Sequence, residues 1–180
     1  MTRRKRKAHN AFGCGMQEPF QIRAIVERSR FMADSFRRLL GRPLADEAEN
    51  LSPEALAAYL YDAPFALLSH TDAADPIFYY ANRKAQELFG YEWSEFTRMP
   101  SRLSAEPLSL EDRERLLAQA RSKGYIDQYK GVRIAKNGSR FRIENVILWN
   151  VTDDQGNFVG QAAIFSHWTP VAEGLSTPTP

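Results

Sequence analysis

The sequence predicts an α+β domain, in which short helices accompany a mostly antiparallel sheet. Three observations predict it: apolar residues spaced by three and four in the first third, alternating residues in the last third, and an Asn-Gly pair between two strand-like runs. The chain has 180 residues, of which 43% are hydrophobic and 12% aromatic. That composition supports one compact core, whereas two full domains would be cramped.

The first third predicts two helices. Apolar residues recur from Phe20 to Leu40 with Arg and Glu between them, which is typical of an amphipathic helix. Gly41 and Pro43 end this helix. A second, shorter helix is expected over 55–61, after a capping serine and a first-turn proline.

The middle of the chain predicts two short strands and two further helices. Apolar runs at 63–69 and 76–80 flank a polar turn, as in two strands joined by a loop. Asn82 can cap a helix that Gly90 ends. Residues 111–122 form the last predicted helix, because apolar residues gather on one side and charges elsewhere.

The last third predicts a three-stranded antiparallel meander. Strands at 128–135 and 139–149 flank the Asn137–Gly138 turn, and a third strand is expected at 158–168. Residues of one parity in the second strand are apolar, so they are predicted to share the packed face of the sheet: Phe141, Ile143, Ile147 and Trp149. Pro, Ser and Thr then predict a disordered tail over 169–180.

The charges predict a mildly acidic body behind a basic leader. Arg3–Lys7 supplies five positive charges, and the rest of the chain has 19 basic and 22 acidic residues, a net charge of −3. Residues 1–18 are expected to form a flexible leader, and nucleic acid contact is not expected except through Arg3–Lys7. No run is long enough to span a membrane and no signal segment is visible, so a cytoplasmic protein without membrane contact is expected.

The sequence contains no recognisable catalytic or metal-binding motif. G-x-S-x-G, H-E-x-x-H, the Walker loop and G-x-G-x-x-G are absent, so no enzyme is expected, although an active site dispersed along the chain stays open. Cys14 is the single cysteine, which excludes an intrachain disulfide and a multi-cysteine metal site. His70 and His167 each stand alone in the sequence, which is a weak signal for a metal ligand, and no metal site is predicted.

Two stretches resemble PAS domains: IFYYANRKAQELFGYEWSEF, and KNGSRFRIENVILWNVTDDQGNFVGQAAIF. More narrowly, LLGRPL, APFALLSH, MPSRLSAEP, RERLLAQARSKGYIDQYKGVRI and GQAAIFSHW resemble the PAS-related MEKHLA domain family, in a standalone form without homeodomain or leucine zipper. The resemblance implies a five-stranded antiparallel sheet with short helices on one face, preceded by the amphipathic helix. It implies a single domain over 19–168, with N-terminal helices at 20–61 and a PAS-like core at 62–168. It implies no established activity.

The resemblance places a candidate ligand pocket between sheet and helices. Its candidate residues are His70, Phe78, Tyr80, Phe141, Asn145, Trp149, Gln161 and Phe165. A dry core with amides paired to protein groups is the alternative. Flavin sensors of the PAS class need a cysteine where this chain has MPSRL, so their covalent photochemistry is not expected and the cofactor is unknown.

The blocks that resemble the family also contain Ser69, Tyr125, Tyr129 and Arg133. They contain Arg102 as well, which is predicted to bridge two loops rather than to bind a carboxylate.

The amphipathic helix carries a candidate dimer interface at Phe31, Met32, Phe36 and Leu39. The alternative is that the helix folds back onto its own sheet and buries the same side chains. The predicted function is a non-enzymatic sensory module that binds a small molecule or a protein partner and acts through dimerisation. A purely structural dimerisation domain without a ligand is the alternative.

Overall fold

The computed structural model describes residues 18–107 and 110–172, and within these residues the chain forms six strands and five α-helices. The leader predicted at 1–18 and the tail from residue 173 lie almost wholly outside the described residues. The predicted tail begins too early, because Thr169 and Pro170 belong to a strand that pairs with residues 141–144.

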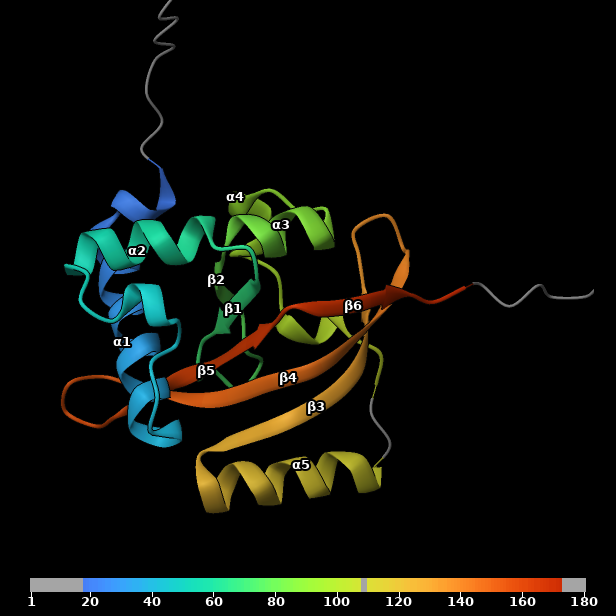
Figure 1. Cartoon of the computed structure of the whole chain (residues 1–180). Helices are drawn as coiled ribbons and strands as arrows, with labels where there is room; N and C mark the ends of the chain where they lie inside the picture. Colours follow the sequence, from blue (N-terminus) through green and yellow to red (C-terminus); the bar gives the residue numbers. More distant parts are fainter. Residues whose placement is uncertain (1–17, 108–109, 173–180) are drawn as a thin grey trace, which may run out of the picture.

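The strands form one antiparallel sheet, which confirms the predicted α+β class (Figure 1). Their order is β2-β1-β5-β4-β3, and β6 pairs with β4 beyond the end of β5. The strands are β1 (Ala66–His70), β2 (Phe78–Ala81), β3 (Tyr125–Ile134), β4 (Arg140–Thr152), β5 (Phe158–Phe165) and β6 (His167–Pro170).

The helices begin and end largely where the local signals place them. The Ser52 Oγ accepts from the Ala55 amide at 3.3 Å and the Asn82 Oδ1 from the Ala85 amide at 3.0 Å. Gly41 and Gly90 end their helices in the left-handed conformation. The helices are α1 (Arg23–Leu40), α2 (Pro53–Asp62), α3 (Arg83–Phe89), α4 (Trp93–Phe96) and α5 (Leu110–Lys123), with 3-10 turns η1 (Pro19–Gln21), η2 (Asp46–Ala48) and η3 (Ser101–Ser104).

Helices cover both faces of the sheet, and each face has its own apolar core. We call the first core the one that α3, α4 and α5 share with Leu68, Phe78 and Phe165. The second core lies beneath α1 and α2 and contains Leu67 and Trp149. In Figure 1, α1 and α2 lie together at one end of the sheet, and α5 lies alongside β3. The sheet therefore separates two apolar cores, one on each of its faces.

The amphipathic helix α1 folds back onto its own sheet. Met32 and Phe36 are 0% and 1% exposed, and the Phe36 ring lies 5.0 Å from the ring of Trp149. The indole Nε1 of Trp149 donates to the Met32 carbonyl at 3.1 Å. Met32 and Phe36 therefore cannot form the predicted dimer interface in this conformation, because both side chains are buried within the chain's own core. Phe31 and Leu39 are half-buried.

Two bulges move residues from one face to the other. Gln128 in β3 and Asn145 in β4 have φ angles of 55° and 53°, and the β3–β4 register shifts beside them. Phe141 and Ile143 consequently belong to the first core, whereas Trp149 belongs to the second. The prediction that all apolar residues of this parity share one face is therefore wrong beyond Asn145.

In the part of the chain that the structure describes, no helix combines the length and the hydropathy that crossing a membrane requires.

Candidate functional site

A cavity of about 500 Å³ opens between the first-core face of the sheet and the segment that contains η3. This volume lies in the range of small-molecule sites. The apolar residues that line it from the sheet lie on β1, β2, β4 and β5: Leu68, Phe78, Ile143, Leu148, Ala162, Ala163 and Phe165. Its other lining residues are Ser69, His70, Ser101, Arg102, Ser104, Ala105, Glu106, Pro107, Tyr129, Arg133 and Gln161.

Four of the predicted pocket residues line this cavity: His70, Phe78, Gln161 and Phe165. His70 and Gln161 are register partners on β1 and β5, so their side chains lie on the same face of the sheet. Phe78 packs edge-on against Phe96, with ring centres 4.9 Å apart, which closes the cavity toward α4. The strands that bound the cavity are therefore among those that the sequence predicted, whereas η3 is not.

Tyr80 and Trp149 do not line the cavity, because they lie on the opposite face of the sheet. Both belong to the second core and are 0% and 1% exposed. The β1–β2 register shifts between Ser69 and His70, so Tyr80 lies opposite Ser69 while Phe78 lies opposite His70. This shift points two residues of equal parity to different faces.

Phe141 and Asn145 are also misplaced by the sequence prediction. Phe141 belongs to the first core but packs against Phe89, with ring centres 5.0 Å apart, outside the cavity lining. Asn145 is an exposed bulge residue and lines a separate hollow of about 230 Å³ near Arg42 and His167. Neither residue can contact a ligand in the main cavity.

The most polar side chains of the cavity were not among the predicted ligand residues. Arg133 and Tyr129 come from β3, and Arg102 and Glu106 come from η3 and the segment after it. Sequence blocks that resemble the family contain Arg102, Tyr129 and Arg133, but nothing in one sequence shows which surface arginine faces a cavity. The separation of these residues along the chain hides their proximity.

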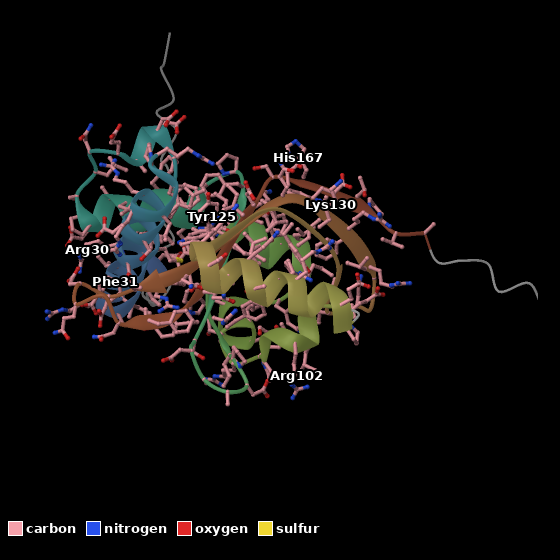
Figure 2. The ribbon with its side chains drawn as sticks, turned by 90° about the horizontal axis from the view of Figure 1, so that it is seen from below. Arg30, Phe31, Arg102, Tyr125, Lys130 and His167 are labelled. Carbon is pink, nitrogen blue, oxygen red and sulfur yellow. The ribbon has the colours of Figure 1, made fainter. Side chains whose placement is uncertain are left out.

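Arg102 bridges two loops, as the sequence favoured. Its Nε donates to Asp75 Oδ1 at 3.0 Å and its Nη2 to Asp75 Oδ2 at 3.2 Å, which ties η3 to the β1–β2 turn. Figure 2 shows Arg102 at the outer edge of the molecule, pointing away from the sheet. At the other side of the mouth, Glu106 forms an ion pair with Arg140. These pairs hold the segment that covers the cavity.

His70 is a half-buried titratable group of the strand lining. Burial lowers the pKa of its imidazole below the ordinary value, a hydrogen bond to Thr71 opposes this, and the nearby Arg28 charge lowers the pKa further. The Nδ1–H donates to the Thr71 carbonyl at 2.9 Å, because a carbonyl can only accept. His70 is therefore neutral near pH 7, with Nε2 as an acceptor.

Arg28 of α1 reaches the back of the same strands from the second-core side. It is 7% exposed, and it donates to the Ser69 hydroxyl at 2.8 and 3.2 Å, to the Val159 carbonyl at 2.9 Å and to the His70 carbonyl at 2.9 Å. Burial lowers the pKa of this guanidinium, and Tyr79 and Asp72 partly oppose the shift. The residue links α1 to the strand segment whose side chains line the cavity.

The described residues hold no group of three or more His, Cys, Asp or Glu side chains placed to bind a metal ion. The chemistry of the cavity is therefore that of a mostly apolar enclosure with a few hydrogen-bonding and charged groups at its ends.

The strand order β2-β1-β5-β4-β3, with helices between the second and third strands and a cavity beneath them, defines a PAS-like domain. The model of the MEKHLA domain matches residues 26–170, and the chain belongs to this PAS-related family. No curated protein matches the chain.

Two solved structures show the same fold. The PAS domain of a protein from Colwellia psychrerythraea is 15% identical, with a TM-score of 0.52, over 64% of this chain and 92% of that chain. An RNA-binding light-oxygen-voltage receptor is 23% identical, with a TM-score of 0.55, over 68% of this chain and 35% of that chain. At these identities the likeness concerns the fold alone.

Proposed function

We propose that the chain is a non-enzymatic, PAS-like sensory module that binds a small organic molecule in the cavity. The observation that carries this proposal is the cavity itself, a half-open pocket of about 500 Å³ whose floor is formed by apolar strand residues. A largely preformed apolar enclosure with a few polar groups is typical of a ligand site.

The output of binding would pass through α1. His70 contributes its ring to the cavity and its carbonyl to Arg28, so one residue contacts both the ligand space and the N-terminal helix. A ligand biases α1 only to the extent that its affinity differs between two arrangements of these strands. Phe31, half-buried on α1 beside Arg30 (Figure 2), is the side chain we propose for a partner or a second copy to contact.

Purified protein from the native host tests the proposal, with mass spectrometry of the native complex and of the denatured extract. We expect a stoichiometric small molecule that raises the melting temperature when added back, because a ligand at a hundred times its Kd stabilises by about 2.7 kcal/mol.

The matched variant is Ala163→Phe, which fills the cavity, and its control is Ala24→Phe at an exposed position of α1. The ligand should be lost from the first and retained by the second. Retention by Ala163→Phe, or an empty protein that no metabolite stabilises, would leave the structural dimerisation domain as the better account.

A further inference from the structure

Arg133 is a cation of the cavity that forms no ion pair with any carboxylate of the described residues. Arg102 and Glu106, the other charged lining residues, are paired with Asp75 and Arg140. Within residues 18–107 and 110–172, no carboxylate forms an ion pair with Arg133. Its Nη1 donates to the Val132 carbonyl at 3.3 Å and its Nη2 to the Tyr129 hydroxyl at 3.4 Å, both long for hydrogen bonds to a guanidinium.

The backbone of β3 sets the position of the Arg133 guanidinium beside the ring of Tyr129. Tyr129, Gly131 and Arg133 follow one another at two-residue spacing after the bulge, so they share a face of the strand. A Cβ on Gly131 would lie 2.5 Å from the Tyr129 hydroxyl, so the glycine makes room for the tyrosine ring to lie along the strand. The guanidinium carbon lies 5.4 Å from the centre of that ring, which leaves donors at its edge free for a ligand.

The other end of the cavity, on β1 and β5, offers acceptors and no charge. The Gln161 Nε2 donates to the Asn150 Oδ1 at 3.0 Å, which leaves the Gln161 carbonyl oxygen as an acceptor. The His70 Nε2 is an acceptor because its Nδ1–H is used by Thr71. An O–H or N–H group of a ligand can donate to either of these lone pairs.

We propose that the cavity binds a monocarboxylic acid with an apolar body, whose carboxylate pairs with Arg133 and whose far end donates a hydrogen bond to His70 or Gln161. This inference rests on the proposed small-molecule function. A single guanidinium matches one carboxylate in charge and in its two-pronged geometry. A phosphate dianion would need further cations to balance its second charge.

The test compares acids with their neutral amides. The probes are 6-hydroxy-2-naphthoate, 3-(4-hydroxyphenyl)propanoate and 10-hydroxydecanoate, each with the amide of the same skeleton, titrated calorimetrically against the full chain. We expect at least one acid to bind about tenfold or more tightly than its amide, because a charge-assisted pair replaces a neutral hydrogen bond. The corresponding naphthyl phosphate should bind more weakly than the naphthoate, and tighter phosphate binding would overturn the assignment to a monoanion.

Two arginine variants locate the preference. Arg133→Met should bring the acid and its amide to similar affinities while the affinity for the amide stays unchanged, which shows that the cavity is intact. Arg102→Met, at the rim and paired with Asp75, should keep the preference. A preference that survives Arg133→Met, or that Arg102→Met removes equally, would overturn the inference.

The cavity-filling variant separates this inference from the proposed function. If acids and amides bind the chain equally and Ala163→Phe blocks both, the carboxylate assignment is wrong and the small-molecule function stands. If none of the acids or amides binds, the carboxylate assignment is again overturned, and the ligand extraction described above decides the function independently.

Discussion

Replacing Arg28 with methionine removes the link between α1 and the strands behind the cavity. The side chain is 7% exposed and makes four hydrogen bonds to three oxygen acceptors: Ser69, His70 and Val159. A buried acceptor that loses its donor costs about 1–3 kcal/mol. Methionine keeps the apolar stem and removes the free-energy cost of burying a charged guanidinium that forms no salt bridge within the described residues, which offsets part of that loss. We expect a net loss of about 2–4 kcal/mol in the free energy of unfolding.

Thermal and urea unfolding measure this loss. For a domain of this size the melting temperature should fall by roughly 4–16 °C. Arg28→Lys should lose nearly as much, because an ammonium keeps the charge but cannot reach three acceptors in the planar geometry of a guanidinium.

The control is Arg30→Met on the same helix. Arg30 forms a two-pronged ion pair with Asp154, with both bonds at 2.6 Å, but the side chains are 31% and 63% exposed, so this pair should contribute less to stability than the buried bonds of Arg28. If Arg28→Met and Arg30→Met unfold alike, or if Arg28→Met is more stable than the natural chain, the hydrogen bonds of Arg28 do not attach α1 and the reasoning is refuted.

Three further outcomes follow from the buried groups. Gly160→Ala should cost about 3 kcal/mol or more in urea unfolding, because φ is 133° and the new Cβ would collide with the His70 carbonyl, whereas Gly156→Ala, with φ of 83° and open space, should cost clearly less. The free energy of unfolding should decrease as the pH is lowered below about 6.5, because His70 takes up a proton in the unfolded chain but resists it in the folded protein. His70→Asn should flatten this pH dependence, and an identical slope in the variant would contradict the assignment. Burial raises the pKa of Tyr80, and within the described residues its hydroxyl has no partner of good hydrogen-bond geometry, only a contact with the Ser29 hydroxyl, so Tyr80→Phe should leave the urea midpoint nearly unchanged or higher, and a clear drop would show that this contact is a full hydrogen bond.

Local signals in the sequence predict the order of elements well. The Ser52 and Asn82 caps, the Gly90 helix end and the Asn137–Gly138 turn each depend on interactions within a few residues. Such interactions are the same whatever the rest of the chain does, so one sequence is enough to recognise them.

The faces of the strands depend on interactions that the sequence does not display. Asn145 adopts a positive φ without being glycine, and the alternation of β4 changes face there. Tyr80 turns away from the cavity because the β1–β2 register shifts between Ser69 and His70. Phe78 and Tyr80 therefore lie on different faces although they are two residues apart. A bulge is stabilised by the partner strand and by packing, so period-two counting fails at the residues that follow it.

The cavity cation is hidden for a related reason. Arg133 alternates with Tyr129 and Gly131 on a strand that mixes buried, half-buried and exposed residues, and this pattern also describes an ordinary edge strand. Only the fold brings Arg133 beside η3, where Ala105 forms a bridge with it. Sequence analysis could therefore predict that β3 exists, but not that Arg133 forms no ion pair with the carboxylates of residues 18–107 and 110–172.

The two ends of the cavity differ in how they can affect α1. His70 lines the cavity and its carbonyl lies 2.9 Å from Arg28, a length at which a shift of a few tenths of an ångström weakens the bond. Gly160 lets β5 approach that carbonyl so closely that no side chain fits, and β1 therefore has little freedom to move without moving Arg28. Arg133 lies on β3, three strands away from β1 in the sheet order. A ligand that contacts only Arg133 should bind without changing α1, whereas one that also contacts His70 or Gln161 should change it, so affinity and signalling are set by opposite ends of the same cavity.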